Sequence, residues 1–143
     1  MTLGRHLAYT GAATAVLLPF RDGSEILLFA AAGILIDADH YLVYVMRRRD
    51  MSIRGMFRYF DEFQAVEKTV PYFGICLFHS VDFLLLVGIL AWFFPLLRPV
   101  VAGMLFHHLL DIIDLTRKGI PFIRAYFLVE HFIRRRGKGY PYY

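Results

Sequence analysis

Histidine and aspartate residues recur in this chain at spacings that suit metal binding. On a helix, His107 and Asp111 lie one turn apart on the same face, and Asp114 continues that stripe. Asp37 and His40 share a helix face at i, i+3. Imidazole and carboxylate groups together are suitable ligands for Zn²⁺, Mn²⁺ or Fe²⁺. The spacing therefore predicts a site for one or two divalent metal ions.

These residues lie within apolar segments. The chain has 143 residues, of which 58% are hydrophobic and 20% charged. An average soluble domain is about 45–50% apolar and about 25% charged, so a bilayer is the expected solvent. A charged side chain near mid-membrane costs at least ~2.5–3.5 kcal/mol, which favours a functional role for several of them together. A membrane core tolerates only helices or closed barrels, and the alternation typical of barrel strands is absent, so the expected fold is all-α.

We expect one membrane-embedded domain over residues 1–143, an integral membrane four-helix bundle with short interfacial helices. Each span approaches the ~20 residues needed to cross ~30 Å of hydrocarbon. The spans are expected at about 2–20, 24–46, 70–97 and 99–115. The interfacial helices are expected at about 52–68 and 120–135, where charged and aromatic residues mix.

Basic residues indicate how these spans are oriented. Lys and Arg cluster around 47–49 and 134–136, whereas the opposite connections hold only Arg21 and Arg98. The positive-inside rule then predicts a multi-pass protein of the inner (plasma) membrane with both termini in the cytoplasm. The basic residues flank apolar segments, so we expect the lipid bilayer as partner and no nucleic acid. The oligomeric state is left open.

This orientation brings the candidate ligands to similar depths. At ~1.5 Å of rise per residue, His40 and Asp111 lie ~9–10 Å from the nearest inner basic residue, and His79 and His107 ~15–16 Å. His6 lies lower, within reach of a tilted helix. We therefore expect one layer of ligands in the cytoplasmic half of the bundle.

Six residues are the candidate metal ligands. They are His6, Asp37, His40, His79, His107 and Asp111. Zinc is the first choice of metal, with manganese or iron as alternatives. A bound metal would neutralise the negative charge of the buried carboxylates. It would also lower the pKa of a coordinated water towards ~7, so that the water can act as a nucleophile in hydrolysis. A spare carboxylate, Asp39 or Asp114, is the candidate general base. Two separate alternatives stay open. Asp39 and His40 would orient a metal ligand instead of binding the metal themselves. His6 would be solvated instead of being a ligand.

Four short segments carry His and Asp residues in order along the chain. They are G-R-H-L at 4–7, L-I-D-A-D-H at 35–40, F-H-S-V at 78–81 and G-M-L-F-H-H-L-L-D at 103–111. These segments resemble the motifs of a known family, the YdjM-like predicted membrane-bound metal-dependent hydrolases, although Ile36 and Phe78 stand where the family has Pro and Thr. The resemblance implies a small inner-membrane hydrolase in which the His and Asp residues of the motifs form the site. The H-x-x-x-D motif is also similar, more distantly, to zinc-dependent phospholipase C.

The expected function is a membrane-bound, metal-dependent hydrolase acting through metal-activated water. Its substrate would be a lipid or another amphiphile, because a site below the interface is reached most easily from the bilayer, and a phosphoester is one expected class. The alternative is a non-enzymatic membrane protein, for metal or proton transport or as an assembly factor, with the same cluster as a structural or transit site. An enzyme needs an open coordination position and a substrate pocket, whereas a structural site is closed.

Overall fold

The computed structural model describes residues 3–70 and 72–138. Within these residues there is no strand, and the only strand-like pairing is an isolated bridge between Gly74 and Arg124. The expectation of an all-α fold is confirmed. The α-helices are α1 (Leu3–Leu17), α2 (Gly23–Leu35), α3 (Ala38–Arg48), α4 (Ile53–Val66), α5 (Val81–Phe93), α6 (Arg98–Arg117) and α7 (Leu128–Lys138). The short 3₁₀ turns are η1 (Glu67–Thr69), η2 (Leu77–His79) and η3 (Pro95–Leu97).

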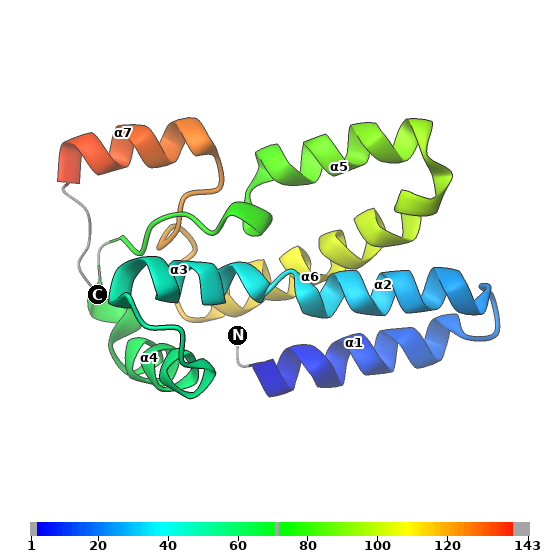
Figure 1. Ribbon diagram of the computed structural model, residues 1–143, viewed down its shortest axis with the longest axis horizontal. Helices are drawn as coiled ribbons and strands as arrows, with labels where there is room; N and C mark the ends of the chain where they lie inside the picture. The colour runs from blue at the N-terminus through cyan, green and yellow to red at the C-terminus, as the bar shows by residue number, and fades with distance from the viewer. Residues whose placement is uncertain (1–2, 71, 139–143) are drawn as a thin grey trace.

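Helices α1, α2 and α6 pack closely together. Helix α1 runs antiparallel to α2, and α6 lies along α2 (Figure 1). A Cβ atom at Gly103 on α6 would overlap the carbonyl oxygen of Phe29 on α2. A Cβ atom at Gly33 would lie 3.2 Å from the side chain of Thr10 on α1. The small residues at these crossings let the three backbones approach one another.

Within residues 3–70 and 72–138, two helical stretches are long and apolar enough to cross a membrane. The first is the 26-residue stretch from Gly23 to Arg48, in which α2 and α3 follow one another with a break at residues 36–37 (Figure 1). The second is the 23-residue stretch from Pro95 to Arg117, which is α6 with its preceding turn. Both occupy positions where spans were expected.

The third expected span, 70–97, is not one continuous helix. Helix α5 begins only at Val81 and has 13 residues, with the Ser80 hydroxyl accepting a hydrogen bond from the Phe83 amide at 3.2 Å as its N-cap. Gly74 has a φ of 122°, which an α-helix does not allow, and residues 72–76 run extended. Hydropathy alone could not show this, because the extended segment is as apolar as a helix.

The extended segment pairs with the chain that follows α6. The Phe73 amide donates to the Ile123 carbonyl at 2.6 Å, and the Ala125 amide to the Gly74 carbonyl at 2.9 Å. The interfacial helix expected over 120–135 therefore begins later, as α7 at Leu128, because residues 120–127 are used for this pairing. The first expected span is also shorter than its range, since α1 has 15 residues.

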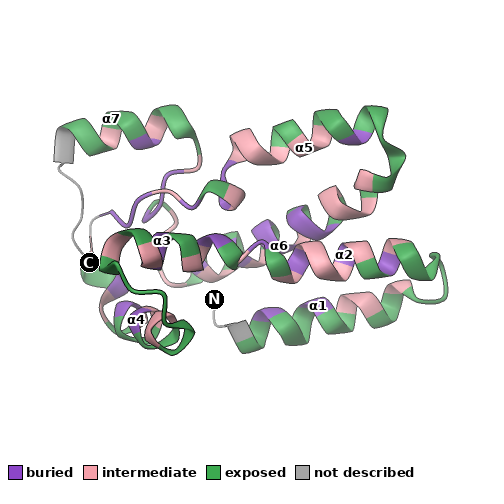
Figure 2. Ribbon diagram, viewed as in Figure 1, coloured by how far each residue is buried: buried purple, intermediate pink, exposed green. Residues whose placement is uncertain are grey.

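Burial separates the inner and outer faces of the helices. Buried residues face the spaces between helices, while the outer faces of α2, α5 and α6 are largely exposed (Figure 2). Many of these exposed side chains are large and apolar, such as Leu27, Ile89 and Leu105. A small apolar core lies at the end of the molecule where α3, α4 and α6 meet. It comprises Val43, Phe63, Phe73, Cys76, Leu115 and Ile123.

Candidate metal centre

Two carboxylates and two imidazoles converge where α2, α3, η2 and α6 meet. Asp37 lies at the break between α2 and α3, His79 in η2, and His107 and Asp111 one turn apart on α6. Asp37 Oδ1 lies 3.3 Å from the Nε2 atoms of both His79 and His107. Asp111 Oδ2 lies 3.6 Å from His79 Nε2 and 3.7 Å from His107 Nε2. We refer to these four side chains as the four-residue cluster.

Hydrogen bonds determine which nitrogen of each imidazole carries a proton. His107 Nδ1 lies 2.8 Å from the Gly33 carbonyl oxygen, which only accepts, so Nδ1 is the donor. His79 Nδ1 likewise lies 3.0 Å from Asp39 Oδ2. In neutral imidazoles the Nε2 atoms are then bare acceptors, and here they lie only 3.1 Å apart. A cation between them, either a proton or a metal ion, is needed to offset the repulsion of the two lone pairs.

The separations that involve the Nε2 atoms of His79 and His107 suit one small metal ion. With metal–ligand distances of about 2.0–2.1 Å for zinc, ligands at the corners of a tetrahedron lie about 3.3–3.4 Å apart. The separations given above, 3.1 to 3.7 Å, lie on both sides of that value. Two imidazole nitrogens and two carboxylate oxygens suit zinc, and also manganese or iron. The residues present therefore fit the predicted metal.

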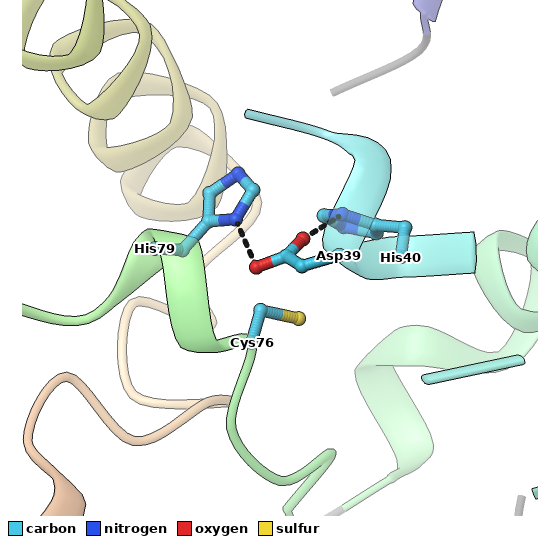
Figure 3. Close-up of side chains that lie close together, drawn as sticks. All are labelled: Asp39, His40, Cys76 and His79. Atoms are coloured by element: carbon cyan, nitrogen blue, oxygen red, sulfur yellow. Dashed lines mark hydrogen bonds and ion pairs between the residues drawn. The ribbon is translucent and has the colours of Figure 1, made fainter. Parts of the chain in front are cut away.

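Asp39 lies between two of the imidazoles (Figure 3). Its Oδ2 accepts hydrogen bonds from His79 Nδ1 at 3.0 Å and from the Phe78 amide at 2.9 Å. Its Oδ1 lies 3.0 Å from His40 Nδ1. A carboxylate behind a metal-binding imidazole fixes the orientation and tautomer of that ring. This geometry favours the alternative in which Asp39 orients a ligand, while its role as a general base stays a prediction.

His40 and Cys76 both lie beside Asp39 (Figure 3). His40 Nδ1 is 3.5 Å from Asp37 Oδ1, and the side chain is 26% exposed. The Cys76 sulfur could also approach an ion held by Asp39, His40 and His79. Burial and the nearby Asp39 charge raise the pKa of the Cys76 thiol well above its usual range. A neutral thiol is a poor ligand, so His40 is the better candidate for a second metal position.

His6 joins the cluster from α1. Its Nε2 lies 3.0 Å from Asp111 Oδ1, and its ring stacks on the His107 ring with centroids 4.0 Å apart. The residue is 2% exposed, so the alternative of a solvated His6 is wrong. All six predicted ligands thus lie in one connected group.

Asp114 is placed differently from the other predicted site residues. Its carboxylate pairs with Lys118 Nζ at 2.9 Å, and the same ammonium lies 2.7 Å from Glu67. Burial alone would lower the pKa of Lys118, but these two carboxylates outweigh it and raise that pKa. A carboxylate held by an ammonium group is less available to accept a proton. The base role of Asp114 stays a prediction.

Arg124 is a site residue that the sequence did not reveal. Its Nη2 donates to Asp111 Oδ2 at 2.8 Å, and the residue is 6% exposed. Burial alone would lower the pKa of this guanidinium, but the Asp111 charge outweighs burial and raises it. A single Arg in an irregular segment has no spacing pattern that could identify it. The bridge with Gly74 could have been found only from the tertiary structure.

A cavity of about 760 Å³ opens beside this group. Its polar wall is formed by the side chains of the site, and α4 and the end of α2 supply most of the apolar walls. The apolar residues include Ile34, Met56, Phe57 and Phe60. The polar residues of the site that line the cavity are His6, Asp37, His40, Asp111 and Arg124, and Asp61, Gln64 and Glu67 add further polar groups from α4 and η1. The site is therefore accessible from a pocket rather than closed.

Comparison with known proteins adds no relative. No family model matches the chain, and neither a curated protein nor a solved structure is similar to it. The family resemblance of the four motifs stays a prediction, and the functional argument depends on the geometry of the site.

Proposed function

We propose that this chain is a membrane-embedded, metal-dependent hydrolase with its metal in the four-residue cluster. The observation that carries the proposal is the approach of the Nε2 atoms of His79 and His107 to within 3.1 Å. Asp37 and Asp111 supply negative charge beside them, which favours a divalent cation over a single proton. Buried carboxylates are otherwise costly without a compensating charge.

A membrane location is supported by the helices around the site. Two helical stretches are long enough to span the bilayer, and their outer faces expose large apolar side chains. In the proposed topology α1 and α5 complete a four-helix bundle, although they are shorter than a full span. Arg47 to Arg49 and Arg117 mark the cytoplasmic ends of the two long stretches.

The side chains have separate roles in the proposed reaction. A divalent metal, when bound, supplies Lewis acidity and lowers the pKa of a coordinated water towards ~7. Asp39 holds His79 in the tautomer that presents Nε2 to the cluster. The same carboxylate accepts from His40 Nδ1, which leaves His40 Nε2 to take up a proton at the cavity wall. His40 is thus the proposed proton acceptor.

The proposed substrates are lipids or other amphiphilic phosphoesters and esters. The cavity combines the polar groups of the site with apolar walls, and it is wide enough for a lipid chain. A closed structural site would lack such a pocket.

Turnover by purified protein tests the proposal. Chelated protein would be reloaded with zinc, manganese or iron and assayed on a panel of amphiphilic phosphoesters and carboxylic esters. We expect metal-dependent product release that falls below detection in Asp37→Asn. Asp22→Asn, the same change in an exposed residue before α2, is the matched control and should keep full activity.

The alternative, a metal or proton transporter or an assembly factor, predicts another outcome. Such a protein would bind metal through the same residues but release no product from any member of the panel. Metal-loaded wild-type protein without turnover would therefore contradict the hydrolase proposal and favour the non-enzymatic alternative.

A further inference from the structure

The guanidinium of Arg124 carries several hydrogen-bond donors, and not all of them have a partner within the described residues. One of them, at Nη2, goes to Asp111 Oδ2 at 2.8 Å. Within the described residues, its buried Nε has no hydrogen-bond partner. A guanidinium presents five N–H donors in a rigid fork that matches carboxylate and phosphate oxygens. A buried donor without a partner is costly, so a ligand that accepts from it would stabilise the site.

The position of Arg124 shows where such a ligand would bind. Its side chain lines the same cavity as Asp37 and Asp111, next to the four-residue cluster. The negative charges of Asp37, Asp39 and Asp111 are balanced only when the charges of a divalent cation and of the Arg124 guanidinium are both counted. A negatively charged group can thus approach the cluster most favourably from the Arg124 side, because Asp61 adds a carboxylate elsewhere on the cavity wall.

The apolar part of the cavity wall is suited to a hydrocarbon chain. Ile34 at the end of α2 and Met56, Phe57 and Phe60 on α4 border it, and Gly4 on α1 lies at its edge. Apolar area removed from water contributes favourably to binding in proportion to its extent. The cavity therefore offers one anion-binding position and one apolar channel.

We propose that this cavity binds a membrane lipid with an anionic oxygen headgroup, with the headgroup on Arg124 and the chain between α2 and α4. The inference deepens the proposed function, because it places the headgroup beside the metal. This inference concerns binding, so it is tested independently of whether the protein shows turnover.

Binding of dodecylphosphonate tests the proposal, because its C–P bond is not a hydrolysable ester. Calorimetry in a neutral detergent would give its Kd, with metal content measured in the same samples. We expect Arg124→Gln to weaken binding about ten- to a hundredfold, since one charged hydrogen-bonding group is lost. Arg117→Gln removes the same charge from an exposed position and should change Kd by less than about twofold.

Further probes separate the headgroup from the chain. Methylphosphonate, which lacks the chain, should bind at least about a hundredfold more weakly. Dodecyltrimethylammonium, which has the chain and a cationic head, should bind more weakly than dodecylphosphonate. Equal Kd values for dodecylphosphonate and either of these probes would overturn the proposal.

A second variant keeps the test valid if Arg124→Gln does not fold. A side chain at Gly4 meets open space in the structure, so Gly4→Trp fills the cavity edge without touching the guanidinium. It should weaken dodecylphosphonate binding about tenfold or more, whereas Gly11→Trp, in open space elsewhere on α1, should not. Unchanged binding in Gly4→Trp, or unchanged binding in folded Arg124→Gln with its metal retained, would overturn the lipid proposal and leave the metal proposal intact. If binding depended on Arg124 but the wild-type protein showed no turnover, the hydrolase proposal would be overturned and the lipid-binding proposal would be retained.

Discussion

At the scale of single residues, the carboxylate of Asp39 makes three contacts that together orient the site. It accepts from His79 Nδ1, from the Phe78 amide and from His40 Nδ1. None of these atoms is a candidate metal-binding atom of the four-residue cluster, yet each affects where such an atom or a cavity-lining ring points. Partners of this kind typically change metal affinity without being ligands.

We predict that Asp39→Asn weakens metal affinity by about ten- to a hundredfold while leaving the protein folded. The amide has a single acceptor oxygen without charge, so it can no longer accept from both His79 and His40, and the bond that fixes the His79 tautomer is weakened. Competition with a chelator of known affinity measures the change. Asp61→Asn is the control, because Asp61 borders the cavity on α4 but has no recorded contact with an imidazole in the part of the chain described. Equal affinity in Asp39→Asn and wild type would show that Asp39 does not orient the site.

The residue types and spacings were informative about the site because metal-ligand chemistry is local. His107 and Asp111, predicted as neighbours on one helix, do share the cluster. Gly33 and Arg124 were missed, since one acts through a backbone carbonyl and the other comes from an irregular segment. Neither leaves a pattern in the sequence.

At the scale of helices, the break at residues 36–37 decides how the Asp-x-Asp-His motif works. On a continuous helix Asp37 and Asp39 would face different directions. With the break, Asp37 reaches His107 on α6, and Asp39 reaches His79 from the start of α3. Helix α6 approaches closely enough for the His107 bond to the Gly33 carbonyl, because Gly103 leaves the crossing free of side-chain atoms.

We predict that Gly103→Ala destabilises the protein by about 1–3 kcal/mol through overpacking against α2. The added Cβ atom would overlap the Phe29 carbonyl oxygen, which cannot move without its helix. Thermal unfolding in detergent measures the loss. Gly88→Ala on α5 is the matched control: its Cβ meets open space, so helix propensity should stabilise it by about 0.5–1 kcal/mol. A Tm for Gly103→Ala at or above that of wild type would contradict the close α2–α6 contact.

The span expected over 70–97 shows where sequence reasoning stopped at this scale. Hydropathy registers apolar residues, but it does not register that residues 72–76 pair with the chain after α6. Gly74, with its positive φ, was the one local signal against a helix there.

At the scale of the whole molecule, the proposed arrangement in a membrane is based on the exposed apolar faces and the basic ends. The proposed topology has both termini on the cytoplasmic side and the turn before α2 on the other. The positive-inside rule is the basis for this side assignment.

Labelling of intact cells tests the topology. In a Cys76→Ser background, a membrane-impermeant maleimide added outside should label Ser24→Cys, before the first long stretch, and not Arg136→Cys on α7. Both positions are exposed, so access is decided by the membrane. Labelling of Arg136→Cys from outside would reverse or refute the predicted orientation.

The account depends most directly on the metal. Elemental analysis of purified wild-type protein after reloading should find at least one zinc, manganese or iron ion per chain. Asp111→Asn should lose that ion, whereas Asp114→Asn, the same change three residues further along α6 at the Lys118 ion pair, should retain it. Absence of stoichiometric metal from wild type, or equal metal in Asp111→Asn, would contradict a metal centre in the four-residue cluster.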